Sequence, residues 1–549
     1  MRPLPELTPE NEFFWTSGAD GVLRMQACDA CDVIVHPPQP YCRKCGGGLE
    51  IRDLSGRGNI VGVTVNHQPW LPSLAPPYAV ILVALEEDPL VRLTSLAVEV
   101  EADAVSIGQS VEVRFEEHED VWLPVFAPRE APADTREVWP EPAMAPTPAR
   151  VTGAAGGAKF ESKVALTGIG MSNVGRRLGV PPLSLTVDAC RAALDDAGLS
   201  IADIDGLATY PGALPGGSGM TEGGVSALME ALPIQPTWIS SGMETPGQGG
   251  SIVNAMLAVA SGLCRHVLCF RTVWEATAAA RAKRGSGGIA AGRRVTGDQQ
   301  WRLPYGAMSA ANWIGLQASH YMHRFGMTRE QLGWIPVVER AHAAKNPAAV
   351  YQDAMTIEDY LSARMITTPF GLYDCDVPCD GAAAVIVSAV ETAKDRPNPA
   401  VLVEAVGTHV SERISWDQGT LTHEPMVSGP GAHLWSRTDL TQGDVDIACV
   451  YDGFSFNALS WIEALGFCGE GEGGAYIDGG ERIREGGDFV LNPHGGQLSA
   501  GRLHGYGFFH EAVTQLQGRA GDRQVGAAET AVVTTGGGTF GGAVLLRKS

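Results

Sequence analysis

Four cysteines near the N-terminus have the type and spacing of a metal site. Cys28 and Cys31 form one CxxC pair, Cys42 and Cys45 form a second, and ten residues separate the pairs. Two such pairs place four thiolates around one tetrahedral zinc ion in a closed structural site. Four free thiols on surface turns are the alternative, and a redox motif fits less well because no βαβ pattern surrounds either pair. We expect a zinc ribbon here.

A second candidate for chemistry is the stretch SSGMETPGQGGSIVNAMLAVASG, residues 240–262. It runs from small polar residues through glycines into apolar residues at helical spacing, and a Gly-rich turn that opens a helix can hold an anion or a reacting carbonyl. The stretch lacks the GK[ST] of a P-loop and is not a GxGxxG motif followed by a ribose-binding acid. Its ligand therefore depends on where the stretch lies in the fold.

The other seven cysteines lie in or beside apolar segments. Such thiols are commonly buried and inert, whereas a nucleophilic thiol needs an electropositive, partly exposed environment. We expect none of them to be a nucleophile, and we expect no disulfide framework because no secretory signal is recognisable. The seven are Cys190, Cys264, Cys269, Cys375, Cys379, Cys449 and Cys468.

The composition is that of a globular enzyme and narrows the class of partner. The chain has 549 residues and a formal net charge of -22, which argues against nucleic acid because phosphate binding requires clustered Lys and Arg. The longest apolar run, 251–270, is interrupted by Asn254, Arg265 and His266, so it indicates a buried helix followed by a strand. We expect a cytoplasmic protein with no membrane span.

The first 128 residues predict two small units. An N-terminal helix and the zinc ribbon occupy residues 1–55, and Val-rich, partly alternating segments in residues 56–128 predict about five short strands in an OB-type β-barrel. The acidic run FEEHED on this barrel argues against single-stranded nucleic acid as its ligand. Residues 129–160 are dominated by Pro, Ala and Gly and predict a linker.

The stretch FFWTSGADGVLRMQACDACDVIVHPPQPYCRKCGG, followed by such a barrel, resembles the zinc-ribbon/OB domain family that accompanies thiolase-like proteins in acyl-CoA metabolism. The resemblance covers residues 10–128. It implies that this unit supports a catalytic partner or binds substrate, and that it does not recognise nucleic acid.

The rest of the chain contains an internal repeat. IADIDGLATYPG at 201–212 parallels QGDVDIACVYDGF at 442–454, and a Gly-rich stretch leads into an apolar helix twice, at 247–262 and 495–516. Two copies of one βαβ-rich layout in the same order predict two pseudo-symmetric α/β halves that pack together. We assign the halves to residues 161–396 and 397–549.

Motifs of these halves resemble the thiolase superfamily, above all its sterol-carrier/lipid-transfer branch. They include KVALTGIGMSNVG, AAKNPAAV, TTPFGLYDCDVPCDGAAAVIV, NPHGGQLSAG and TTGGGTFGGAVLL. The resemblance implies the five-layered α/β/α/β/α thiolase fold. It also implies a homodimer formed through the thiolase-like unit, with CoA thioesters as ligands.

Both cysteines that the resemblance would place in a thiolase site are absent. A thiolase carries an acyl group on one Cys and moves the proton of an acetyl thioester with another. The first would lie near Glu244–Gly247, within the Gly-rich stretch 240–262, and the second where Thr534 stands. Threonine supplies no thiolate near neutral pH, so acyl-enzyme chemistry is not expected.

The enolate-stabilising part of the site is altered rather than lost. Where thiolase relatives carry Asn-Glu-Ala-Phe and Gly-His-Pro, this chain has Tyr-Asp-Gly-Phe at 451–454 and Gly-Arg-Leu at 501–503, followed by His-Gly-Tyr. A retro-aldol cleavage of a β-hydroxyacyl-CoA needs a base and enolate donors but no acyl carrier. The chain thus resembles the aldolases that shorten steroid side chains, which implies release of a ketone and a short acyl-CoA.

We expect Tyr451 to transfer the proton or to bind the hydroxyl, with Asp452 orienting it. His504 and Tyr506 are alternatives for base or acid. Each also has a structural explanation, as a core tyrosine or as a cap of a Gly-rich loop. The expected substrate-binding residues are Arg502 or His494, for the thioester oxygen or the CoA phosphates, together with Gly496 and Gly537.

Two other functions stay open from the sequence. A non-catalytic acyl-CoA-binding scaffold that assists a separate hydratase or transferase would also lack both cysteines. A thiolase-type acyltransferase would use one of the scattered thiols. Conversion of a hydroxyacyl-CoA to a ketone separates the aldolase from the scaffold, and complete thiol alkylation separates it from the acyltransferase.

Overall fold

The computed structural model describes residues 2–130, 159–213, 219–220, 223–284, 294–537 and 540–549. Nearly all of the linker predicted at 129–160 lies outside the described residues. Within the described ranges, no helix combines the length and the apolarity needed to cross a membrane.

The N-terminal module consists of the two units that the sequence predicts. A short helix, α1 (Glu12–Trp15), precedes a three-stranded antiparallel sheet of β3 (Ile34–Val35), β2 (Leu23–Cys28) and β4 (Leu49–Leu54). In the barrel, β5 pairs with both β6 and β8, while a bridge between Ala97 and Phe126 joins the end of β7 to β9. The barrel strands are β5 (Arg57–Asn66), β6 (Tyr78–Leu85), β7 (Arg92–Leu96), β8 (Ser110–His118) and β9 (Val121–Pro128).

The thiolase-like part has two halves with the same strand order. Numbered along each half, the strands lie in the order third, second, fourth, fifth, first, and the two first strands, β10 and β18, pair antiparallel at the centre of one continuous sheet. In the first half this order is β12 (Trp238–Ser241), β11 (Gly206–Thr209), β13 (His266–Trp274), β17 (Asp380–Ala389) and β10 (Val164–Met171). In the second it is β20 (Val490–Leu491), β19 (Ile447–Cys449), β21 (Thr530–Thr534), β22 (Ala543–Lys548) and β18 (Val401–Gly407).

The halves repeat each other down to single hydrogen bonds. Asp205, just before β11, accepts from the backbone N–H groups of Arg265 and His266 at the start of β13. Its counterpart before β19, Asp446, accepts from the N–H groups at the start of β21. The internal repeat of the sequence therefore corresponds to a true structural repeat.

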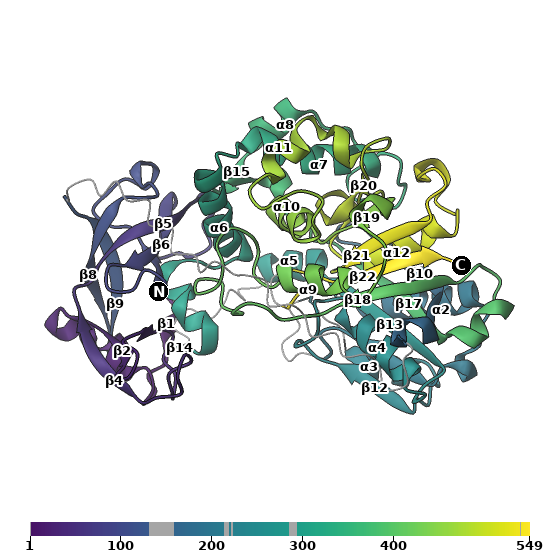
Figure 1. Ribbon diagram of the computed structural model, residues 1–549, viewed down its shortest axis with the longest axis horizontal. Coiled ribbons are helices and arrows are strands. Elements are labelled where there is room, and N and C mark those ends of the chain that lie inside the picture. The colour runs from purple at the N-terminus through teal and green to yellow at the C-terminus, as the bar shows by residue number, and fades with distance from the viewer. Residues whose placement is uncertain (1, 131–158, 214–218, 221–222, 285–293, 538–539) are drawn as a thin grey trace.

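The helices and the two five-stranded halves of this continuous sheet form five layers (Figure 1). Alternate residues of a strand face opposite sides, so Leu268 and Phe270 of β13 pack with the outer helices whereas Val267 and Cys269 face the central layer. In that central layer α12 contacts β17 of the first half and β21 of the second. The outer helices are α2 (Pro182–Ala197) and α3 (Gly224–Ala231) on one side, and α9 (Ser428–Trp435) and α10 (Ser455–Ala464) on the other; the central helices are α4 (Gly250–Ala260) and α12 (Tyr506–Leu516).

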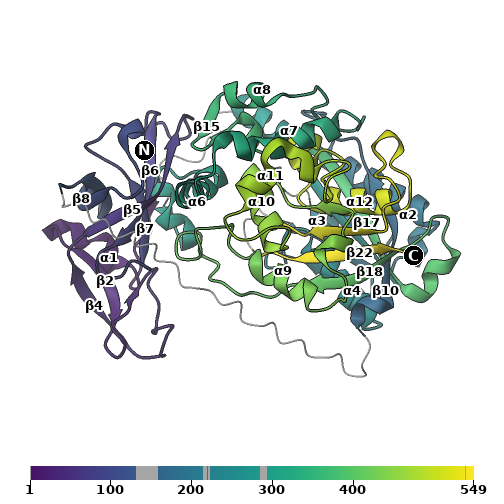
Figure 2. The same cartoon turned by 45° about the horizontal axis from the view of Figure 1, so that its top comes forward.

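A long insertion between β13 and β17 joins the two parts of the molecule. Its strand β15 pairs antiparallel with β5 of the barrel, and its helix α6 lies against the same strand, where the N–H of Val63 donates to the Ser319 hydroxyl. Figure 2 shows α6 between the N-terminal module and the thiolase-like halves. The insertion contains α5 (Glu275–Arg284), β14 (Arg294–Val295), α6 (Ala310–Phe325), α7 (Arg329–Ala343), α8 (Ile357–Ser362), β15 (Met365–Thr367) and β16 (Phe370–Gly371); β14 pairs with β1 (Leu4–Pro5), and α11 (Gly473–Ile477) packs on α7.

Candidate active site

Segments of the two halves meet at the ends of their strands. The loop that opens α4 is bonded to the loop after β21: the N–H of Gly249 donates to the Thr535 carbonyl (2.6 Å), and the side-chain amide of Gln248 bonds both the N–H and the carbonyl of Gly537. The N–H of Tyr451, after β19, donates to the Thr534 hydroxyl (2.7 Å). The segments that the sequence selected for chemistry therefore converge.

Neither position expected for a thiolase cysteine offers a free nucleophile. The Thr245 hydroxyl donates to the Gly247 carbonyl (2.7 Å), and the Thr534 hydroxyl accepts the bond just described. The nearby thiol of Cys379 is buried and that of Cys375 is half-buried, and loss of solvent, followed by neighbouring carboxylates, raises the pKa of both well above the ordinary value. They are therefore protonated at neutral pH and unsuited to carry an acyl group.

Tyr451 is a buried side chain in a charged environment. Its ring packs edge-on against Phe508, with 6.3 Å between the centroids, and it is 6% exposed. Burial raises the pKa of the hydroxyl well above 10, the carboxylates of Asp376 and Glu424 raise it further, and Arg502 opposes them. The phenol is thus neutral near pH 7 and can donate a hydrogen bond.

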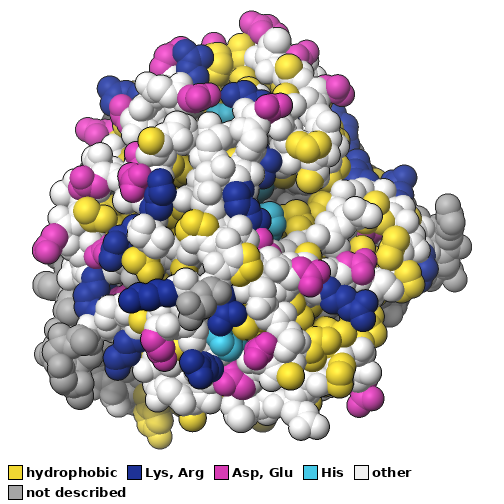
Figure 3. All heavy atoms as spheres, turned by 90° about the vertical axis from the view of Figure 1, so that its right-hand side faces the viewer, with side chains coloured by type: hydrophobic (Ala, Val, Ile, Leu, Met, Phe, Trp, Pro, Cys, Tyr) yellow, Lys and Arg dark blue, Asp and Glu magenta, His cyan; other side chains and the backbone are white. Residues whose placement is uncertain are grey.

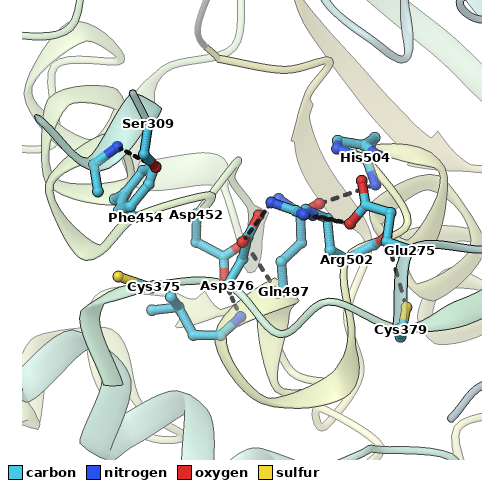
Figure 4. A network of polar contacts seen from close by, with 12 residues as sticks. Glu275, Ser309, Cys375, Asp376, Cys379, Asp452, Phe454, Gln497, Arg502 and His504 are labelled. Atoms are coloured by element: carbon cyan, nitrogen blue, oxygen red, sulfur yellow. Dashed lines mark hydrogen bonds and ion pairs between the residues drawn. The ribbon is translucent and has the colours of Figure 1, made fainter. Parts of the chain in front are cut away.

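Arg502 is held by two buried carboxylates (Figure 4). Its Nη1 donates to Asp376 (2.9 Å), and Nε donates to Glu275 at the start of α5 (2.8 Å). Burial raises the pKa of Asp376 to about 7, although the guanidinium lowers it. Arg502 is therefore occupied within the protein, and Asp376 can exchange a proton near neutral pH.

His504 is fixed as a hydrogen-bond donor. The residue has a left-handed backbone (φ 48°), its N–H donates to the side chain of Gln497 (2.9 Å), and its Nδ1 accepts from Arg271 (2.9 Å). Since an arginine only donates, Nδ1 carries no proton and the neutral ring presents Nε2–H. Burial, and then the nearby arginines, lower its pKa well below 6.5, so His504 is a poor base.

Asp452 binds backbone rather than Tyr451. Its two oxygens accept from the N–H groups of Gln497 (3.0 Å) and Leu498 (3.2 Å), in a π-helical turn at Gly496–Ala500. Burial raises the pKa of Asp452 and of the adjacent Glu339, and the charge of Asp452 raises that of Glu339 further. Gly496 is pressed against this pair with φ 60°, and a Cβ there would collide with the Asp452 carboxylate.

The other predicted site residues have structural partners. The Tyr506 hydroxyl lies 2.6 Å from that of Ser251, where it joins α12 to α4. The His494 ring is buried edge-on against Phe508 (5.5 Å), and burial lowers its pKa to about 3. Gly537 lies so close to Glu424 that a Cβ on the glycine would be 2.7 Å from the carboxylate oxygens. The first two therefore contribute packing at the centre of the fold.

Sequence reasoning missed the charged residues that surround these side chains. Arg271 interrupts the apolar strand HVLCFRTVW, and a buried charge in such a strand was the available signal. Asp376 stands in the quoted motif TTPFGLYDCDVPCDG without having been selected. The neutral Gln497 likewise stands unselected in the quoted motif NPHGGQLSAG, whereas no sequence pattern marked Glu275 or Glu424.

The zinc site lies in the N-terminal module. The four sulfur atoms of Cys28, Cys31, Cys42 and Cys45 all lie within 4.8 Å of one another. Tetrahedral zinc with bonds of about 2.3 Å requires sulfur atoms about 3.8 Å apart, which the arrangement fits. These thiols hold a structural zinc ion, as the spacing predicted.

Three family models match the chain. The rubredoxin-like zinc ribbon domain of ChsH2 matches residues 15–50, and the C-terminal OB-fold domain of ChsH2 matches residues 52–116. The thiolase C-terminal domain-like model matches residues 407–546. These matches agree with the ribbon, the barrel and the second thiolase-like half.

Known proteins resemble the thiolase-like part. A steroid side-chain-cleaving aldolase of Thermomonospora curvata is 32% identical over 385 residues, 68% of this chain and 95% of that protein. A 17-hydroxy-3-oxo-4-pregnene-20-carboxyl-CoA lyase of Mycobacterium tuberculosis is 32% identical over 387 residues, 69% of this chain and 97% of that protein. The solved structure titled "Ltp2-ChsH2(DUF35) aldolase" is 30% identical, with a TM-score of 0.62, over 71% of this chain and 99% of that one.

Proposed function

Since the chain belongs to the thiolase-like family of steroid side-chain-cleaving aldolases, we propose that it cleaves a β-hydroxyacyl-CoA, a steroid side-chain thioester, to a ketone and a short acyl-CoA. The observation that carries the proposal is the pair of replaced thiolase cysteines. Thr534 and the Thr245 loop use their hydroxyls to hold backbone, while a neutral phenol and a neutral imidazole remain beside them. Such a site can bind an enolate but cannot carry an acyl group.

The retro-aldol step requires one proton acceptor and one stabilised oxyanion. The β-hydroxyl loses its proton, the Cα–Cβ bond breaks, and its electron pair becomes the thioester enolate, which is then protonated at Cα. Tyr451 binds the substrate hydroxyl, and Asp376 accepts the proton because its pKa of about 7 matches the task. The Nε2–H of His504 donates to the thioester oxygen.

The scaffold around these groups limits how they move. Arg271 fixes the tautomer of His504, and Arg502 fixes the carboxylate of Asp376. The Asp452–Glu339 pair holds the turn that supplies Gln497, which in turn binds the backbone of His504. The roles first considered for Tyr506, His494, Gly496 and Gly537 are not needed for this mechanism.

A second copy of the chain is the proposed partner in a dimer. The strand β12 ends the sheet, and Ile239, Met243, Leu257 and Leu263 leave about half of their surfaces exposed on or near it. An apolar sheet edge is a surface that another copy can cover. Light scattering of the wild type and of Ile239→Lys with Leu263→Glu should show a dimer and a monomer respectively; equal masses would contradict the proposal.

Nucleic acid is not among the proposed partners, and we propose a cytoplasmic location. Figure 3 shows the face of the thiolase-like halves turned away from the N-terminal module, where acidic and basic side chains are interspersed. A phosphate-tracking surface requires a continuous basic patch instead. The net charge of -22 also argues against nucleic acid as a partner.

The direct test is incubation of the purified chain with a panel of β-hydroxyacyl-CoAs that includes tertiary alcohols of steroid side chains. Mass spectrometry should detect a ketone and a shortened acyl-CoA. The activity should survive alkylation of thiols outside the zinc ribbon, because no thiol reacts. Absence of product across the whole panel would contradict the aldolase and favour a scaffold, whereas loss of activity with an intact ribbon would favour an acyltransferase.

A further inference from the structure

One segment crosses from the OB barrel to the proposed cleavage site. It connects β18 to α9, residues 408–427. Leu421 is fully buried in the hydrophobic core of the barrel, while Val427, six residues later, is buried in the thiolase-like core. The segment is therefore anchored in both parts of the molecule.

The barrel end of the segment is held at the edge strand β7. The side-chain amide of Gln418 accepts from the N–H of Arg92 (3.3 Å) and donates to its carbonyl (2.5 Å), much as a neighbouring strand would. The Thr94 hydroxyl, on the same strand, lies 3.4 Å from the Asp417 carboxylate. Arg413 adds a bond to the backbone carbonyl of His36 in the zinc-ribbon unit (3.1 Å).

The other end of the segment presents Glu424 to the site. The side chain is fully buried, and its Oε2 accepts from Asn457 (2.6 Å). Asn457 in turn accepts from the N–H of Phe454 (2.8 Å), three residues after Tyr451. A Cβ on Gly537 would lie 2.7 Å from the Glu424 carboxylate and 2.8 Å from the Tyr451 ring, so these groups are close neighbours.

We propose that Glu424 is a positioning residue of the cleavage site and that the OB barrel holds it there through Gln418 and the rest of segment 408–427. Glu424 acts through Asn457 on the turn that carries Tyr451, and its charge lies beside the phenol. The barrel thus contributes to cleavage by positioning this carboxylate. The inference rests on the proposed function.

Two variants and a control test the inference. Glu424→Gln keeps an oxygen that accepts from Asn457 but removes the charge, and Gln418→Ala removes the contact with β7, 6 residues away from Glu424 in the sequence. Arg114→Ala, in an exposed ion pair with Glu112 elsewhere on the barrel, is the control. Because small misplacements reduce catalysis steeply, we expect Glu424→Gln to lower kcat about 30-fold and Gln418→Ala about 10-fold, with KM and melting temperature little changed. The control should match the wild type.

Hydrogen exchange provides a readout that needs no substrate. Gln418→Ala should increase exchange of the amides at 424–427 and 451–457, and Arg114→Ala should not. An inactive wild type would overturn the proposed function, while exchange would still test the coupling. Wild-type kcat in Glu424→Gln would overturn the positioning role of Glu424, and unchanged exchange in Gln418→Ala would overturn the role of the barrel.

Discussion

Two tyrosines occupy equivalent places in the two halves, and their surroundings differ. Tyr210 follows β11 and Tyr451 follows β19, and each is only 6% exposed. The backbone carbonyl of Tyr210 accepts from the buried Arg271, whose guanidinium also lies 5.5 Å from the tyrosine ring. Tyr451 instead lies beside two carboxylates, those of Asp376 and Glu424, together with the guanidinium of Arg502.

Equivalent positions in the two halves of the duplicated fold have different functions. The strand, the preceding aspartate and the tyrosine are the same in both halves, so the backbone alone does not make a site. At the second-half tyrosine, the insertion between β13 and β17 of the first half and the segment 408–427 supply the nearby acidic side chains. In the first half the polar groups of the α4 loop bond one another and the backbone. The reactivity of Tyr451, compared with Tyr210 at the equivalent position, therefore depends on the carboxylates that the inserted segments place beside it.

Removing the hydroxyl of each tyrosine in turn is the strongest test of whether only Tyr451 takes part in cleavage. Tyr451→Phe should lower kcat by about 10³, because proton transfer and hydroxyl binding are lost together. Tyr210→Phe should change kcat less than about threefold, since it keeps the ring under Arg271 and removes only a group outside the mechanism. Steady-state release of the ketone measures both, and equal losses in the two variants would contradict this difference in function.

The raised pKa of Asp376 predicts that kcat/KM increases with pH. Its raised pKa means that the carboxyl is protonated below about pH 7 and ionised above it. If the ionised form accepts the hydroxyl proton, kcat/KM rises with pH through about 7 and then levels off. Asp376→Asn should lower kcat about 100-fold and abolish this rise.

An exposed aspartate of the first half serves as the control for that profile. Asp188 lies on the outer helix α2 and faces solvent. Asp188→Asn should keep both the rate and the rising limb near pH 7. A rising limb that persists in Asp376→Asn would assign the proton acceptor to another group.

Alanine substitutions at two glycines with left-handed backbones distinguish the cost of steric crowding from the cost of backbone strain. Gly496 supports the second-half site and has no room for a Cβ beside Asp452, whereas Gly262, after α4 in the first half, has nothing within 4 Å. Gly496→Ala should destabilise the fold by about 2 kcal/mol and Gly262→Ala by about 1 kcal/mol, which is the strain alone. Chemical denaturation measures both, and equal values would mean that the π-helical turn relaxes without loss.

Local patterns predicted the parts of this molecule that local geometry determines. The CxxC spacing was sufficient for the zinc ribbon because four thiolates and two turns define it. The repeat of Asp205 and Asp446 predicted the two halves because each aspartate binds the next parallel strand in the same way. Both sequence patterns lie within a few residues of the local structure that they predict.

The pairing within the site could not be predicted in the same way. The sequence selected Arg502 and His504 as candidates, and the structure places them in the converging region, but their protonation and pairing could not be predicted because their partners lie far away in the chain. Arg502 is neutralised by Glu275 and Asp376, and His504 receives its tautomer from Arg271. A motif identifies a side chain, whereas its protonation depends on contacts that only the folded chain brings together.

Returning a thiol to the first-half loop should have the smallest effect. Thr245→Cys loses the bond to the Gly247 carbonyl but keeps most of the volume, so kcat for cleavage should stay within about threefold of the wild type. The contacts that the structure describes for the Thr245 hydroxyl include a backbone carbonyl and no base, so the new thiol should stay protonated and form no acyl adduct. Intact-protein mass spectrometry after incubation with an acyl-CoA tests this directly. An acylated Thr245→Cys chain, absent from the wild type, would show that the first half still activates a nucleophile and that only the residue was lost.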